Sequence, residues 1–223
     1  ERFFEHRIAQ YFHDSKRIAV FISTTLCDNH LINYLKTLPC SEEKADHAMA
    51  IGAQLCTEQE LALSIICTEW AGTIFRKLFE QGEDVRNGMA KAIMYRADAF
   101  LIQGDLPESI RGYDEAIQIM RDLHVEDRKY VKNNLATAIM HRANAFLDQG
   151  DLSEAIRGYD EAIQIRRDLH TEGRKHVQND LAMAIMNWSL AVKTQGDLPE
   201  AIRGFDEAIK IRRNLLTEKR KYV

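Results

Sequence analysis

The chain has 223 residues, 45% of them hydrophobic and 29% charged, so it can bury a sizeable core. A net charge of −4 without a basic stripe argues against a nucleic-acid partner. We find no signal peptide and no apolar run of membrane-spanning length, and therefore expect a cytoplasmic protein without a membrane partner.

Residues 1–41 are expected to form a helical cap region. The opening ERFFEHRIAQYF has the pattern of an amphipathic helix. Residues 16–24 (KRIAVFIST) are rich in β-branched and aromatic side chains; we favour a helix here, with a short strand as the alternative. The only Cys/His cluster is Cys27, His30, Cys40 and His47, whose spacing fits no familiar zinc site, so no metal is expected.

Residues 42–84 are expected to form a degenerate copy of the repeat that follows. Its first helix should begin with Ser41 as the N-cap, and Thr57-Glu58-Gln59-Glu60 has the pattern of a capping box before the second helix. Four residues keep the spacing of the later copies: Gly52, Leu55, Ser64 and Ala71.

Three clear repeats follow, at 85–130, 131–176 and 177–222. The tripeptide Gln-Gly-Asp begins at Gln103, Gln149 and Gln195, so the period is 46 residues. A fixed period of this size is typical of a solenoid built from stacked supersecondary units. The last residues, TEKRKYV, match those that close the earlier copies, so we expect the chain to be cut at the start of a further repeat and to have further domains.

Each repeat is predicted to be two antiparallel helices joined by a short turn. In the second clear copy the apolar residues before Gly150 recur every three or four positions, as do those after it. Glycine suits the left-handed position that ends a helix, and the aspartate after it suits a following N-cap. Small residues at fixed positions should let the helix axes approach closely. The large side chains expected to fill the space between helices are Tyr113, Tyr159 and Phe205.

One segment of each copy resembles the tetratricopeptide repeat. It begins at a small residue near the end of the first helix, passes through the Gly-Asp turn, and ends at an alanine of the second helix. Phe146, Gly150, Ala155, Tyr159 and Ala162 hold that family's spacing, and the other copies keep it. The resemblance implies an all-α, right-handed α-solenoid of antiparallel helix pairs. The period is longer than the family's usual one of about 34 residues, so we expect a long-helix variant. The position of the family's closing proline holds Arg121, Arg167 and Arg213.

The resemblance also implies that the first helix of each repeat lines a concave groove. Asparagine and methionine recur there, and an asparagine ladder offers donors and acceptors to an extended peptide. The alternative is that they cap the helix or pack between repeats. Methionine at a position where carboxylate-clamp relatives carry polar side chains argues against chaperone-tail binding. The candidate partner-binding residues are Asn87, Lys91, Met94, Asp98, Asn133, Thr137, Met140, Asn144, Asn179, Met183, Met186 and Leu190.

No catalytic residue, cofactor or phosphate-binding loop is apparent, so this segment is not expected to be an enzyme. Arginine pairs such as Arg166-Arg167 and Arg212-Arg213 alternate with acids and are interpreted as a solvated helix face. We expect a protein-interaction scaffold that binds a peptide or partner domain. The alternatives are a regulatory or substrate-recruiting arm of a larger bacterial-type enzyme, such as a caspase-like peptidase fusion, and a self-assembly module.

Overall fold

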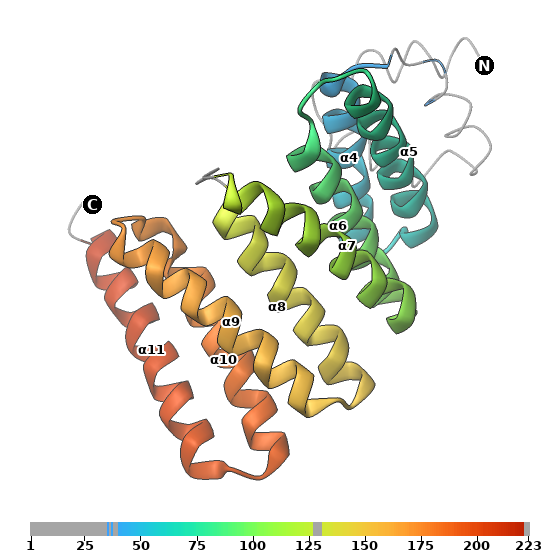
Figure 1. Cartoon of the computed structure of the whole chain (residues 1–223). Coiled ribbons are helices and arrows are strands. Elements are labelled where there is room, and N and C mark those ends of the chain that lie inside the picture. Colours follow the sequence, from blue (N-terminus) through green and yellow to red (C-terminus); the bar gives the residue numbers. More distant parts are fainter. Residues whose placement is uncertain (1–34, 36, 38–39, 127–130, 221–223) are drawn as a thin grey trace. The chain divides into compact units, whose positions relative to one another are not determined.

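The computed structural model describes residues 35, 37, 40–126 and 131–220, and all regular structure in them is helical (Figure 1). This confirms the predicted all-α class. The predicted N-terminal region, with residues 16–24, Cys27 and His30, lies almost wholly outside the described residues. The elements are α4 (Glu42–Thr57), α5 (Leu61–Glu80), α6 (Arg86–Gln103), α7 (Leu106–Val125), α8 (Val131–Gln149), α9 (Leu152–Thr171), the short 3₁₀ helix η1 (Lys175–Val177), α10 (Gln178–Gln195) and α11 (Leu198–Arg220).

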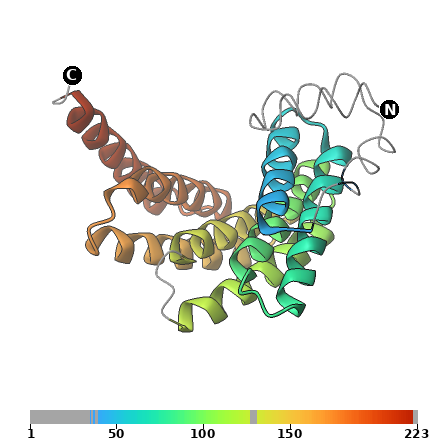
Figure 2. The ribbon, with the colours of Figure 1, turned by 90° about the horizontal axis from the view of Figure 1, so that it is seen from above.

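The chain divides into two compact units, one ending at Ile119 and the other beginning at Met120, so that α7 contributes to both. In the first unit α4 packs against α5, and α5 packs against α6. In the second unit α8 pairs with α9 and α10 pairs with α11, while α9 packs against α10 to join the pairs. Figures 1 and 2 both show these pairs as antiparallel hairpins. The predicted helix pairs are therefore present.

The Gln-Gly-Asp motif makes the turn inside each hairpin. Gly104, Gly150 and Gly196 have φ values of 87°, 90° and 105°, in the left-handed region that favours glycine. The aspartate after the second glycine, Asp151, then accepts a hydrogen bond from the Glu154 amide at 3.1 Å and caps α9. Asp105 and Asp197 do the same for the helices that follow them. One tripeptide thus ends the first helix and begins the second.

The α4–α5 turn differs from the sequence-based expectation. Ser41 caps α4 as predicted, since its side chain accepts a hydrogen bond from the Lys44 amide. The predicted capping box at Thr57 is wrong, because Thr57 is the last residue of α4 and its hydroxyl donates to the Gln54 carbonyl. The residue before α5 is Glu60, and its side chain makes no capping bond. Gln59, with φ 64°, makes the left-handed turn that glycine makes in the later copies.

On α7, α9 and α11 a glycine sits against a small residue of the first helix of the same hairpin. A Cβ added to Gly112 or Gly158 would lie 2.9 Å from the Cβ of Ala97 or Ala143, closer than real Cβ contacts allow. In α4 and α5 the sizes are exchanged: Gly52 is on the first helix, and its added Cβ would lie 3.2 Å from that of Cys67. In each hairpin one partner without a side chain therefore brings the two helices together.

Gly158→Ala is expected to lower the free energy of unfolding by about 1–3 kcal/mol, because the new methyl forces α8 and α9 apart. Gly72→Ala is the matched control: Gly72 is also buried within a helix, but its added Cβ would meet nothing within 4 Å. That control should gain about 0.5–1 kcal/mol from the better helix propensity of alanine. Urea denaturation measures both, and equal effects at the two sites would contradict the proposed close approach.

Candidate functional site

The predicted partner-binding residues lie on the first helices α6, α8 and α10. In the second unit the two first helices are neighbours, since the Asn187 amide on α10 donates to Asn144 Oδ1 on α8 at 3.2 Å. A partner that runs across α8 would therefore also meet α10. We refer to the predicted residues on these two helices as the first-helix face: Asn133, Thr137, Met140, Asn144, Asn179, Met183, Met186 and Leu190.

One of the predicted binding positions, held by Asp98 and Asn144, contacts the second helix of its own repeat. The Tyr113 hydroxyl donates to Asp98 at 2.6 Å, and the Tyr159 hydroxyl donates to Asn144 at 2.7 Å. In the last copy the tyrosine is Phe205 and the acceptor position holds Leu190. The acceptor is lost where the hydroxyl is lost, so the side chain at this position matches its tyrosine or phenylalanine partner. Burial, and then the charge of Asp98, raise the pKa of Tyr113, so its hydroxyl stays protonated.

The methionines were expected to offer apolar surface to a partner, and this is wrong for two of them. Met94 and Met140 are buried in the protein. The Met140 sulfur accepts a hydrogen bond from Arg166 Nη1 at 3.3 Å, and Thr137 on the same face accepts from Arg166 Nη2 at 3.1 Å. Only Met186, with Arg212 Nη1 3.8 Å from its sulfur, and Met183 stay half-exposed. Methionine thus packs against the second helix in the inner copies.

The asparagines differ in how accessible they are. Asn179 is exposed, whereas Asn87 and Asn133 are half-buried. The Oδ1 atom of Asn133 is buried and has no hydrogen-bond partner among the described residues. Lys91 is half-buried, and its charge lowers the pKa of Asp46 on α4 against the larger, raising effect of burial. In the second unit the accessible part of the first-helix face is therefore mostly on α10.

The arginines on the second helices do more than face solvent. Arg121 pairs with Glu161 at 2.7 Å, and Arg167 pairs with Glu207 at 2.9 Å, each time across to the second helix of the next copy. Arg166 is only 1% exposed, so the interpretation of Arg166-Arg167 as a solvated pair is wrong for its first member. Burial lowers the pKa of Arg166, and the charge of Asp180 opposes that effect. These side chains join neighbouring repeats.

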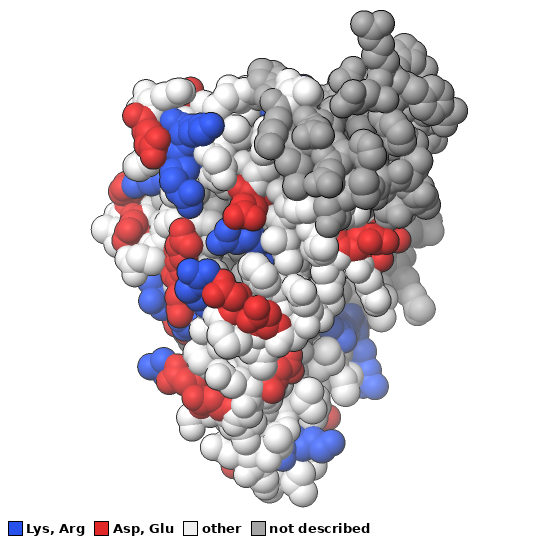
Figure 3. Space-filling model, turned by 90° about the vertical axis from the view of Figure 1, so that its right-hand side faces the viewer, with Lys and Arg blue, Asp and Glu red and all other residues white. Residues whose placement is uncertain are grey.

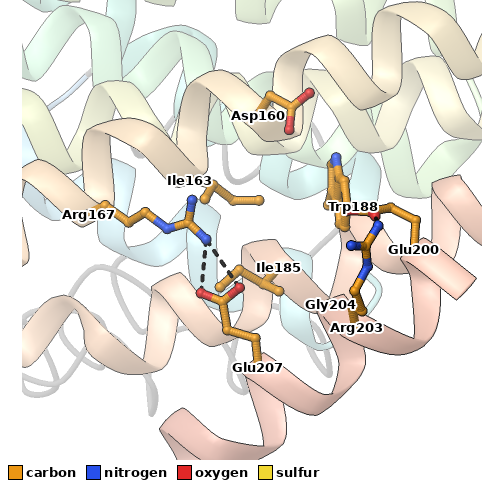
Figure 4. A pocket seen from close by; sticks show the side chains of 9 residues that line it. All are labelled: Asp160, Ile163, Arg167, Ile185, Trp188, Glu200, Arg203, Gly204 and Glu207. Atoms are coloured by element: carbon orange, nitrogen blue, oxygen red, sulfur yellow. Dashed lines mark hydrogen bonds and ion pairs between the residues drawn. The ribbon is translucent and has the colours of Figure 1, made fainter.

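A pocket of about 360 Å³ opens between α9, α10 and α11 (Figure 4). Trp188 lies on the same side of the pocket as the Arg203–Glu200 pair, and the Arg167–Glu207 pair lies on the opposite side. This pocket was not predicted from the sequence. Its lining residues are Asp160, Ile163, Arg167, Ile185, Trp188, Glu200, Arg203, Gly204 and Glu207.

Metal and thiol chemistry find no support among the described residues. They contain no group of three or more His, Cys, Asp or Glu side chains that could hold a metal ion. Cys56 and Cys67 are buried free thiols, and burial raises the pKa of Cys67 to about 12, which keeps it protonated and unreactive. Cys40 is a free thiol at the surface.

The described surface shows no broad region of one charge on the face seen in Figure 3. There, lysine and arginine lie next to aspartate and glutamate among the residues drawn in colour. Across the described helices, none is long and apolar enough to cross a bilayer.

Comparison with known proteins places the chain among helical repeats. Residues 135–172 match the sequence model of the tetratricopeptide repeat, while no curated protein matches the sequence. BtubC of P. vanneervenii superposes with a TM-score of 0.67 at 17% identity, covering 95% of this chain and 87% of that one. A putative kinesin light chain of Podosopora anserina, described as having nearly identical TPR-like repeats, gives 0.66 at 12% identity, with 96% and 98% covered.

A Rap protein complexed with competence and sporulation factor also shares the fold. Its TM-score is 0.65 at 14% identity, and the match covers 90% of this chain and 53% of the Rap protein. At such identities the structural likeness shows the fold alone. Residues 135–172 thus match a tetratricopeptide repeat, and the paired helices described above share the helical-repeat fold of these structures.

Proposed function

We propose that this segment is a protein-interaction scaffold whose first-helix face holds a peptide or a partner domain. The observation that carries the proposal is the accessible row on α10. Asn179, Met183, Met186 and Leu190 follow one another at spacings of four, three and four residues, so they share one side of the helix. Asn179 and Leu190 are exposed, the latter by 48%. The row combines an amide with apolar side chains.

This combination suits a polypeptide better than a small charged molecule. The Asn179 amide can donate to and accept from a main chain, while methionine and leucine offer an adaptable apolar surface. Among the structural neighbours, a Rap protein is seen in a complex with competence and sporulation factor. That neighbour supports a polypeptide ligand for this fold without identifying one for this chain.

The test is a double variant on α10, Asn179→Ala with Leu190→Asp, in a protein whose melting temperature is unchanged. A partner captured by the unaltered chain should bind the variant at least about tenfold more weakly, which is about 1.4 kcal/mol, as calorimetry would measure. One lost hydrogen bond contributes about 0.5–1.5 kcal/mol of this and the buried charge adds more. Met94 and Met140 are unsuitable targets, because a charge there would disturb the core.

Arg157→Ser is the matched control. Arg157 is exposed on α9 and pairs with Glu154 of its own helix, so its loss should leave both stability and binding unchanged. Arg121 and Arg167 are poorer controls because they reach the next repeat. A partner that binds the α10 variant normally would exclude the first-helix face.

Self-assembly is a second candidate, supported by α11. Ile209 is 46% exposed, whereas Ile163, at the same position one repeat earlier, is 6% exposed. Leu198, Ile202 and Leu216 on α11 are exposed as well. Such a face fits the stacking of another helix pair. Light scattering after size exclusion should then show a dimer that Ile202→Lys with Ile209→Lys converts to a monomer; a monomeric parent protein would exclude this candidate.

A further inference from the structure

The pocket beside Trp188 holds one more carboxylate than it holds cations. Arg167 pairs with Glu207 at 2.9 Å, and Arg203 pairs with Glu200. Among the described residues Asp160 forms no ion pair with either arginine, and its polar neighbour is the Trp188 N–H. The five charged side chains of the lining thus leave the pocket with a net charge of −1 centred on Asp160.

The surroundings of Asp160 favour a cation that enters the pocket. Asp160 is an exposed residue, but neighbouring side chains bury its carboxylate enough to raise its pKa. Two weaker effects oppose this, an attraction to the Trp188 N–H and the charge of Arg167. The Trp188 nitrogen is buried, points toward Asp160 in Figure 4 and lies outside hydrogen-bonding geometry with every described residue. A bound cation would replace the hydration that the carboxylate has lost.

The other copies indicate which cation fits. Trp188 occupies the position of Arg142 in the preceding repeat and of Arg96 in the one before. The Arg142 guanidinium lies 5.9 Å from the centre of the Phe146 ring, so this position already combines a guanidinium with an aromatic ring. In the last copy the arginine is replaced by tryptophan, whose ring face attracts cations most strongly. The aspartate on the preceding helix is the same in both copies: Asp114 comes before Arg142, and Asp160 comes before Trp188.

We propose that this pocket binds the guanidinium group of an arginine side chain presented by another polypeptide. Asp160 accepts its N–H groups, and the Trp188 ring stacks on its planar face. We expect the guanidinium to come from a polypeptide, because in the earlier copies it belongs to an arginine side chain on a helix. The site is separate from the first-helix face, because Trp188 lies two positions from Met186, roughly 200° around α10. It therefore does not depend on the proposed function.

The probe is Nα-acetyl-L-arginine methylamide, titrated while the two tryptophan indole N–H resonances are followed by NMR. Trp188 should shift saturably, and Trp70 on α5, the other tryptophan, should not. The corresponding citrulline compound has the same shape without the charge and should cause no saturable shift. Asp160→Asn should weaken probe binding at least about tenfold.

Trp188→Arg is the matched variant, since it restores the residue of the earlier copies. It should fold and bind no probe by calorimetry, because its own guanidinium occupies the pocket. Equal binding of the citrulline compound, unchanged affinity in Asp160→Asn, or no saturable Trp188 shift up to about 50 mM probe would overturn the proposal. Free L-arginine binding about tenfold more tightly than the blocked probe would overturn the polypeptide source and indicate a small metabolite.

Discussion

Replacing Tyr159 by alanine is expected to lower the free energy of unfolding by about 3–5 kcal/mol, the range for truncating a large buried aromatic side chain. Tyr159 is 0% exposed, and its hydroxyl donates to Asn144 at 2.7 Å. The variant leaves a cavity between α8 and α9 and removes the Tyr159 hydrogen bond to the Asn144 oxygen, which also accepts one from Asn187. Because each repeat contacts only its neighbours, the loss should also loosen α10 and α11.

Tyr159→Phe removes the hydroxyl but keeps the ring, so it measures the contribution of the hydroxyl alone. The last copy carries Phe205 at this position, so the ring alone can fill the space, and the cost should be about 0.5–1.5 kcal/mol. Chemical denaturation with an unchanged m value measures both variants. If Tyr159→Ala melted like the parent protein, the helix packing described for the second unit would be wrong.

Replacing Arg166 by methionine is expected to leave stability unchanged or to raise it, by up to about 4 kcal/mol. Arg166 is among the largest fully buried side chains, and its Nε atom has no hydrogen-bond partner among the described residues. Burial lowers its pKa, so the fold carries a cost for keeping it charged. Met120 fills the same position in the first clear copy and is fully buried there.

Arg166→Ala is the contrasting variant. It removes the charge but also the volume, so we expect a loss of about 2–5 kcal/mol from the cavity between neighbouring helices. Urea denaturation should therefore rank methionine at or above arginine and alanine well below both. A loss of about 3 kcal/mol or more in Arg166→Met would show that attraction to Asp180 outweighs the cost of burial.

The turns and helix pairs could be predicted from the sequence because the reasons for them are local. Gly150 needs only its own backbone to adopt a positive φ, and Asp151 caps the helix that begins beside it. The 46-residue spacing then repeats this turn along the chain. The α4–α5 turn could not be predicted in this way, since Gln59 adopts a positive φ that is uncommon for residues other than glycine.

The candidate binding surface was harder to predict. Its residues were chosen from the resemblance to the tetratricopeptide repeat, and the side chains that contact them from other helices could not be known from the sequence. Nothing in a single helix shows that Asn144 accepts from Tyr159, or that Met140 lies beneath Arg166. The matched changes of Asn144 to Leu190 and Tyr159 to Phe205 carried that signal in the sequence itself. The change from Arg142 to Trp188 was equally visible, but its meaning depends on Asp160, which comes from another helix.

The most direct test of the scaffold proposal is amide hydrogen exchange on the full chain with and without a captured partner. The first-helix face predicts added protection in peptides from α8 and α10, strongest around Met183, Met186 and Leu190, and little change along α9 and α11. Protection confined to α9 and α11, with α8 and α10 exchanging as in the free protein, would contradict the account and place the partner on the second-helix side.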